Sequence, residues 1–220
     1  MLLAAGRGER MRPLTDAAPK ALLAAGGRPL VARLIERLAA EGYAELVINH
    51  AHLGAMIEAA LGDGARFGVR IGYSPEQAAL ETAGGIANAL ALLGLAPFLA
   101  VNADLHTDYP FGALRSALRP DADAHLVLVD NPPHHPAGDF ALAGGRVANR
   151  GAAMLTFSGI GVYRPALFAG IAPGARAPLA PLLRAAADRG GVTGERFAGR
   201  WVDVGTPERL ARLDAELSGG

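Results

Sequence analysis

One lysine and two glycines stand close together near the start of a chain that otherwise uses arginine as its cation. Lys20 is the only lysine, against 20 arginines. Under that bias, a lysine indicates a position that needs a compact ammonium rather than a planar guanidinium. Gly6 and Gly8 precede it, and glycine lets backbone N–H groups come close to an anion. The stretch 3–20 therefore predicts a triphosphate-binding loop.

Two aspartates that follow predicted strands could complete such a site. Asp104 comes just after the buried strand 98–102, and Asp203 lies in the segment 201–206. Open α/β sheets bind ligands beyond the carboxyl ends of their strands. Carboxylates hold Mg²⁺, the metal bridges phosphate oxygens, and cationic side chains neutralise a leaving pyrophosphate. These residues predict a metal-assisted phosphoryl or nucleotidyl transfer. Each aspartate could instead cap a following helix, although Thr206 is better placed than Asp203 for that role.

Composition narrows the class of protein. The 220 residues suit a single domain, and 51% of them are hydrophobic, enough for a sizeable core. The 21 basic and 21 acidic residues cancel, which gives no support for a nucleic-acid or membrane partner. The absence of cysteine excludes disulfides, zinc–thiolate sites and cysteine nucleophiles. No leader segment is expected, because the first residues run straight into the glycine loop. No membrane span is expected either, because glycines, an asparagine and a proline interrupt the apolar stretch 83–101.

Alternating periodicities predict the elements that position these residues. Strands are expected at 1–4, 44–49, 69–73, 98–102 and 125–129, and helices at 29–41, 53–61, 85–93 and 111–118. The second half predicts a hairpin around residues 143–145, a strand at 155–163 and helices at 179–187 and 210–217. The pattern predicts an α/β fold with a Rossmann-like mixed, mostly parallel sheet, helices on both faces and a small hairpin-containing elaboration.

The N-terminal motif carries a family resemblance. It reads Gly6-Arg7-Gly8-Glu9-Arg10-Met11-Arg12-Pro13, followed by Pro19-Lys20. This resembles the G-x-G-x-R-M-x-P…P-K loop of the sugar-1-phosphate nucleotidyltransferases. Within that family, the stretches 47–54, 80–85, 125–132, 138–140 and 155–160 resemble the subgroup that uses UTP and N-acetylmuramic acid 1-phosphate in peptidoglycan recycling. The resemblance implies a cytoplasmic enzyme in which a sugar-1-phosphate oxygen attacks the α-phosphorus of UTP, releasing pyrophosphate.

The resemblance also implies roles for individual residues. Arg10 would bind the triphosphate, Lys20 would contact phosphates of both substrates, and Asp104 with Asp203 would hold Mg²⁺. The implied catalytic set is Arg10, Lys20 and Asp104. The implied nucleotide-binding set is Ala5, Gly6, Gly8, Glu9, Arg10, Lys20, Gln77, Gly84, Gly85 and Asn102, and the implied sugar-phosphate-binding set is Asp139, Thr156, Ser158 and Gly159. A single domain 1–220 is expected, with about 1–120 binding the nucleotide and about 121–220 the sugar phosphate.

Several alternatives stay open on the sequence. The chain could be a guanylyl- or thymidylyltransferase acting on mannose-1-phosphate or glucose-1-phosphate, although those relatives tend to carry Leu-Gly-Thr where this chain has Leu80-Glu81-Thr82. It could also be a non-catalytic nucleotide-sensing subunit on the same fold. The cation that binds the acceptor phosphate is unassigned, with Arg150 one candidate. His134 and His135 could form a metal pair, although adjacent histidines more often point apart. Monomer and dimer are both compatible with the sequence.

Overall fold

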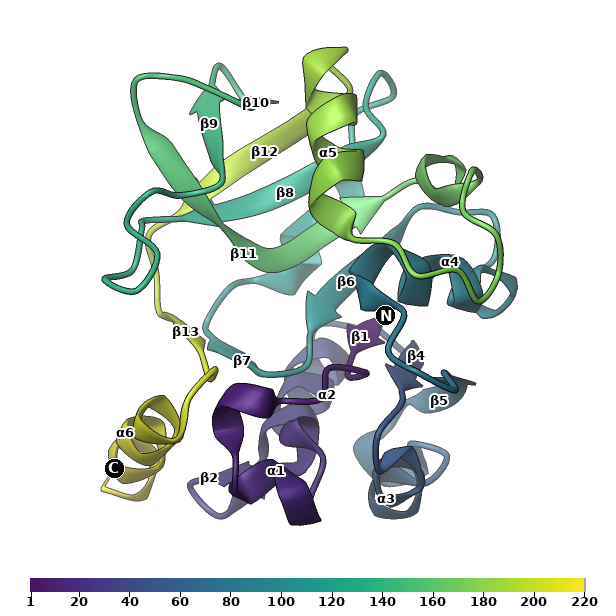
Figure 1. Cartoon of the computed structure of the whole chain (residues 1–220), viewed down its shortest axis with the longest axis vertical. Coiled ribbons are helices and arrows are strands. Elements are labelled where there is room, and N and C mark those ends of the chain that lie inside the picture. The colour runs from purple at the N-terminus through teal and green to yellow at the C-terminus, as the bar shows by residue number, and fades with distance from the viewer. Residues whose placement is uncertain (220) are drawn as a thin grey trace.

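One mixed β-sheet runs through the molecule, as the computed structural model of residues 1–219 shows (Figure 1). Its strand order is β5-β4-β1-β6-β11-β8-β12-β10-β9. The strands are β1 Leu2–Leu3, β4 Glu45–His50, β5 Arg70–Pro75, β6 Phe98–Asn102, β8 Ala124–Val129, β9 Phe140–Ala143, β10 Arg146–Ala148, β11 Met154–Tyr163 and β12 Val192–Phe197. Two-stranded pairings are also formed by β2 Ala24–Ala25 with β3 Arg28–Pro29 and by β7 Leu105–Thr107 with β13 Trp201–Asp203.

Strand direction changes along the sheet. The first four strands in the order, β5, β4, β1 and β6, are parallel. Strand β11 is inserted antiparallel between β6 and β8, and β12 is parallel to β8. Strands β8 and β12 therefore run in the direction of the first four. The predicted mixed sheet is confirmed; parallel pairs make up its N-terminal half, and antiparallel pairs dominate its C-terminal half.

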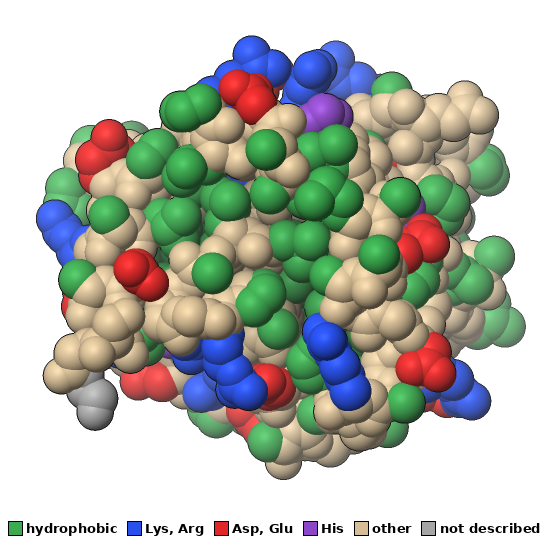
Figure 2. Space-filling model, turned by 90° about the horizontal axis from the view of Figure 1, so that it is seen from below, with side chains coloured by type: hydrophobic (Ala, Val, Ile, Leu, Met, Phe, Trp, Pro, Cys, Tyr) green, Lys and Arg blue, Asp and Glu red, His purple; other side chains and the backbone are tan. Residues whose placement is uncertain are grey.

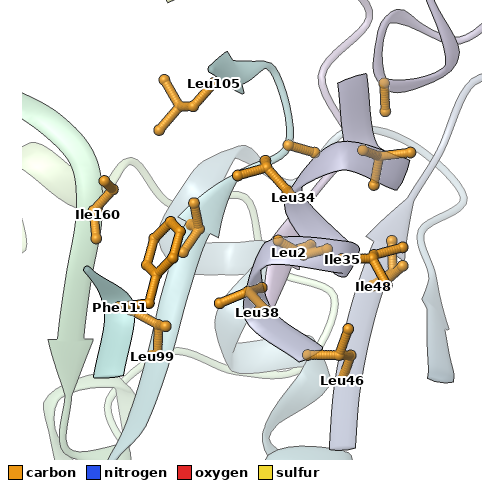
Figure 3. Close-up of a cluster of buried hydrophobic side chains, with 14 of the residues drawn as sticks. Leu2, Leu34, Ile35, Leu38, Leu46, Ile48, Leu99, Leu105, Phe111 and Ile160 are labelled. Carbon is orange, nitrogen blue, oxygen red and sulfur yellow. The ribbon is translucent and has the colours of Figure 1, made fainter. Parts of the chain in front are cut away.

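Helices cover both faces of the sheet. Helices α2 (Leu30–Ala40) and α3 (Gly54–Leu61) pack on one face, and α4 (Glu81–Leu93) and α5 (Leu179–Asp188) on the other. In α2, Leu34, Ile35 and Leu38 point toward Leu2 and Ile48 of the sheet (Figure 3). Burying an aliphatic side chain of this kind contributes about 1.5–3 kcal/mol. This packing holds β1 at the centre although it has only two residues.

A third apolar cluster supports the N-terminal loop. It joins Met11, Ala25 and Leu30 to Leu210 and Leu213 of α6 (Pro207–Ser218). Helix α6 therefore packs against the segment that contains the glycine motif. The remaining short helices are η1 Glu9–Met11, α1 Leu14–Ala17, η2 Lys20–Leu22, η3 Ala65–Phe67, η4 Phe111–Ser116 and η5 Pro165–Phe168.

Most predicted elements are present, and the differences include the short strands β2, β3, β7 and β13, which were not predicted. Strand β12 is absent from the prediction because Gly194 and two charged residues hide its periodicity, and its pairing with β8 and β10 stabilises it. The predicted helix 111–118 is the 3-10 segment η4, and α4 begins at Glu81 rather than at Gly85. The hairpin of β9 and β10 is confirmed, with Gly144 and Gly145 at φ 55° and 75° in its turn.

Charged side chains of both signs lie on the surface (Figure 2). Both basic and acidic side chains are scattered among apolar ones on the face shown in Figure 2. Within residues 1–219, every helix is too short or too polar to span a bilayer.

Candidate active site

The predicted site assembles at the carboxyl ends of three neighbouring strands. Leu3 of β1 pairs with Asn49 of β4 on one side and with Asn102 of β6 on the other. The N–H of Ala103 donates to the carbonyl of Leu3 over 3.1 Å. After Leu3 the chain leaves the sheet as the glycine loop. The loop and the end of β6 therefore enclose a cavity of about 470 Å³, called here the first cavity.

The first cavity collects most of the predicted nucleotide-binding residues. Its predicted lining residues are Ala5, Gly6, Gly8, Glu9, Arg10, Lys20, Asn102 and Asp104. The lining carries three cations, namely Arg7, Arg10 and Lys20, and three carboxylates, namely Glu9, Glu81 and Asp104. The cations and the glycine backbone can contact phosphate oxygens, and a carboxylate can share a metal ion with them.

Lys20 and Asp104 form an ion pair across this cavity. The ammonium of Lys20 donates to Asp104 Oδ2, and the two residues are 84 positions apart in sequence. Their side chains are 14% and 21% exposed, so solvent screens the pair only in part. Gly8, at φ 67°, lets the loop pass beside the lysine: a Cβ there would lie 3.2 Å from Lys20 Cβ and 2.9 Å from Thr15 Cγ2.

A buried polar network, absent from the sequence prediction, connects the loop to the turn before α4. Asn49 Oδ1 accepts the N–H of Ala4 over 2.9 Å, and its Nδ2 donates to Glu76 Oε1 over 2.7 Å. Glu76 Oε2 accepts the N–H of Leu80 over 2.9 Å. Asn49 and Glu76 are 3% and 7% exposed. The position of Asn49 at the end of a parallel strand could have indicated it; no sequence signal indicated Glu76.

Three predicted nucleotide contacts take other positions. Gln77 is exposed and lies outside the first cavity. Gly84 and Gly85 are buried packing positions: a Cβ on Gly84 would lie 2.3 Å from the carbonyl of Ala175, and one on Gly85 would lie 2.6 Å from Asn49 Nδ2. These glycines shape the site by close approach, and Ala79, Glu81 and Thr82 line the cavity at this turn instead.

Glu81 adopts a backbone conformation that favours glycine. Its φ is 59°, and it forms the first residue of α4. Its carboxylate pairs with Arg176 Nη2 at 2.6 Å. Glu81 also lines both the first cavity and a second cavity, of about 310 Å³, that adjoins it. Glu81 therefore places a carboxylate where the two cavities meet, although its backbone is in the left-handed conformation.

Replacing Glu81 by glycine is expected to raise the free energy of unfolding by about 0.5–1 kcal/mol. Glycine removes the strain of the left-handed backbone, and this gain is larger than the loss caused by the greater conformational entropy of glycine in the unfolded chain. The melting temperature should rise by about 1–4 °C. Glu81→Ala is the matched control, since it removes the same ion pair and keeps the Cβ. Equal melting temperatures for the two variants would contradict the strain argument.

Asp203 reaches the same region through β13. It lies opposite Leu105 of β7, and the N–H of Val204 donates to the carbonyl of Asp104 over 3.1 Å. The backbones of the two predicted metal ligands are therefore adjacent. The Asp203 side chain pairs with Arg209 at 2.8 Å and lines a separate cavity of about 380 Å³, the third cavity. Thr206, not Asp203, caps α6.

The donor set is compatible with Mg²⁺. Asp104 offers carboxylate oxygens to the first cavity, and Asp203 stands on the adjoining strand. Within residues 1–219 no group of three or more Asp, Glu, His or Cys side chains could hold a metal alone. Mg²⁺ is usually bound through one or two carboxylates together with substrate phosphates, so two aspartates are sufficient. To bind Mg²⁺, the Asp203 carboxylate would have to contact the metal and Arg209 together, or lose its ion pair with Arg209.

The two adjacent histidines face different partners. Arg209 Nη1 donates to His134 Nε2 over 2.9 Å, while His135 Nε2 lies 3.1 Å from Asp139 Oδ1. Burial, and then the positive charge of Arg209, lower the pKa of His134. A lowered pKa favours the neutral imidazole, which can accept that hydrogen bond. Arg150 is exposed and lines none of the three cavities, so it stays only a candidate for the acceptor phosphate.

The second cavity adjoins the first and contains part of the predicted sugar-phosphate site. The two share Leu3, Glu81, Thr82 and Asn102. Asp139 and Gly159, both predicted to bind the sugar phosphate, line it. Asp139 Oδ2 accepts the N–H of Phe157 over 2.8 Å, which fixes its carboxylate at the cavity wall.

The hydroxyls of Thr156 and Ser158 form hydrogen bonds within the protein. The resemblance implies instead that they contact the sugar phosphate. Thr156 donates to Asn131 Oδ1 over 2.9 Å, and Ser158 donates to the carbonyl of Val127 over 2.7 Å. A register shift between β11 and β8 falls at Ser158 and Gly159 and sets these directions. Gly159, at φ 79°, is close to Asn102, since a Cβ would lie 2.4 Å from Asn102 Nδ2.

Comparisons with known proteins identify relatives over the whole chain. A family model described as nucleotidyl transferase matches residues 1–145. An N-acetylmuramate alpha-1-phosphate uridylyltransferase from Neisseria meningitidis serogroup B is 54% identical over 222 residues, covering 98% of this chain and 96% of the relative. One from Caulobacter vibrioides is 35% identical over 233 residues, covering 99% and 96%. The crystal structure of a Bacillus anthracis protein, assigned as a glucose-1-phosphate thymidylyltransferase and bound to sucrose, superposes with a TM-score of 0.86 at 21% identity, covering 99% of this chain and 94% of that one.

Proposed function

This chain belongs to the nucleotidyl transferase family, and we propose that it transfers a uridylyl group from UTP to N-acetylmuramic acid 1-phosphate. The products are UDP-N-acetylmuramic acid and pyrophosphate, and the reaction would serve peptidoglycan recycling in the cytoplasm. The observation that carries the proposal is the Lys20–Asp104 pair inside a cavity bounded by the glycine loop. The choice of UTP and of this acceptor is supported by the two relatives of that name, which match nearly the full chain.

UTP would lie in the first cavity. The backbone of Gly6 and Gly8 would approach the phosphates, and Arg10 would neutralise part of their charge. The network of Asn49 and Glu76 connects the turn before α4 to the start of the loop, so this wall would be ordered before the nucleotide binds. Pre-ordered groups bind with less loss of conformational entropy.

The acceptor would lie in the second cavity, with its phosphate directed to the first through the residues that the two share. A phosphate oxygen of the acceptor attacks the α-phosphorus of UTP, a new P–O bond forms, and the bond to the pyrophosphate oxygen breaks. Asp139, whose carboxylate is held by the N–H of Phe157, would accept a hydrogen bond from the sugar.

Lys20 would stabilise the charge that develops as the pyrophosphate leaves. Its ammonium is already held in the first cavity by Asp104, so the site reorganises little during the reaction. Asp104 and Asp203 would hold Mg²⁺, which when bound withdraws charge from phosphate oxygens. In the free protein Asp203 is paired with Arg209, and this pair would have to open or rearrange for Asp203 to reach the metal.

A substrate panel tests the proposal. The protein is assayed for pyrophosphate release with each of UTP, GTP and dTTP against the 1-phosphates of N-acetylmuramic acid, mannose and glucose, in the presence of Mg²⁺. We expect the highest kcat/KM for UTP with N-acetylmuramic acid 1-phosphate. A higher kcat/KM for another pair would overturn the substrate assignment, and tight UTP binding without pyrophosphate release from any acceptor would favour a nucleotide-sensing protein.

A further inference from the structure

The second cavity has a single basic side chain in its lining. Among residues 1–219 that border it, Arg184 of α5 is the only lysine or arginine. Its other ionisable lining groups are the carboxyls of Glu81 and Asp139 and the phenol of Tyr163. Phe157, Leu179 and Leu183 supply apolar walls. A negatively charged ligand group in this cavity would meet one cation and two carboxylates.

The guanidinium of Arg184 has no ion-pair partner among residues 1–219. Asp188, one helical turn later, accepts a hydrogen bond from Asn149 over 2.7 Å instead. The same Asn149 amide donates to the carbonyl of Arg184 over 2.9 Å, which anchors this part of α5. Arg184 Cζ lies 5.3 Å from the centre of the Phe140 ring, so the ring orients the guanidinium at the cavity.

The proposed acceptor carries two anionic groups. Its phosphate is on C1, and the carboxylate of its lactyl ether is on O3. In the proposed pose the phosphate is directed to the first cavity, where Lys20 and Arg10 lie. The lactyl carboxylate then remains in the second cavity, where a carboxylate without a cationic partner would be repelled by Asp139, while Glu81 is already paired with Arg176.

We propose that Arg184 binds the lactyl carboxylate of the acceptor and thereby makes this chain selective for N-acetylmuramic acid 1-phosphate over sugar phosphates without that group. The inference rests on the function proposed above. A guanidinium suits this role because its fork can donate two hydrogen bonds to one carboxylate. Arg184 is a specificity-determining residue here and takes no part in the phosphoryl transfer.

The test compares two acceptors that differ only in the lactyl group, N-acetylmuramic acid 1-phosphate and N-acetylglucosamine 1-phosphate. In Arg184→Gln, the ratio of kcat/KM for the first over the second should fall by about 10- to 100-fold, the value of a charge-assisted hydrogen bond. Arg184→Lys should recover part of the ratio, and Arg184→Glu should lower it further. Arg66→Gln is the matched control, because Arg66 lies 4.4 Å over the Phe67 ring and borders none of the three cavities.

The methyl ester of the lactyl group gives an independent readout. Esterification should reduce kcat/KM strongly in the wild type and little in Arg184→Gln, because the charge contact is already absent there. Equal loss on both acceptors, or no change in the ratio, would overturn the role of Arg184. Failure of the wild type to use N-acetylmuramic acid 1-phosphate at all would instead overturn the proposed function, and the role of Arg184 with it.

Discussion

Replacing Lys20 by alanine should lower kcat for pyrophosphate release by roughly 10²–10³-fold, the effect of removing one preorganised charge contact. The expectation follows from its position: the side chain is 14% exposed, and its ammonium is held by Asp104 inside the first cavity. It is the only lysine of the chain. The measurement is steady-state and single-turnover pyrophosphate release with saturating UTP and Mg²⁺.

The Lys20→Arg variant separates charge from geometry. It keeps the positive charge, but the planar guanidinium is larger than the ammonium, and Gly8 packs closely beside the side-chain stem at this position. We therefore expect it to be nearly as slow as Lys20→Ala. UTP binding measured by calorimetry checks that the cavity is intact. Wild-type turnover in Lys20→Ala would rule out the assigned role.

The second large effect concerns Asp104. Asp104→Asn conserves the shape of the side chain and removes its charge, so kcat should fall by roughly 10²–10³-fold and the Mg²⁺ concentration needed for half-maximal rate should rise. A Mg²⁺ titration of pyrophosphate release measures both quantities. If the variant kept both the rate and the Mg²⁺ dependence of the wild type, Asp104 would be only the partner of Lys20.

Two further variants sharpen the interpretation of Asp104. Lys20 and Asp104 are in direct contact, so the double variant should lose less than the product of the single losses. Asp203→Asn tests the second proposed ligand. If it leaves the Mg²⁺ dependence unchanged, the pair with Arg209 is the role of Asp203.

The position of the glycine loop beside the end of β6 could be predicted because its signals are local. Glycines at 6 and 8 and a strand ending at Asn102 mark backbone turns through short-range geometry, and the carboxyl ends of parallel strands meet at one edge. The same reasoning did not find Glu76, whose hydrogen bonds to Asn49 depend on how β5 and β4 lie side by side.

The acceptor side was less predictable, since side-chain direction there depends on distant pairing. The register shift between β11 and β8 directs Ser158 to the carbonyl of Val127, and no local pattern reveals that shift. Strand β12 likewise exists because β8 and β10 pair with it. Glu81 resembles an ordinary turn residue in sequence, and only the backbone shows its left-handed conformation.

The amino-acid order alone therefore determined the α/β alternation, the glycine loop and the identity of its charged groups, because backbone preference and periodicity act over a few residues. Tertiary structure decided which charges meet. Lys20 contacts Asp104 across 84 positions, Asp203 pairs with Arg209, and Arg184 lines the second cavity while Asn149 donates to Asp188. Most of these contacts form between residues that are distant in sequence and become neighbours only when the chain packs. Local sequence patterns therefore do not reveal which of several possible partners a charged side chain contacts.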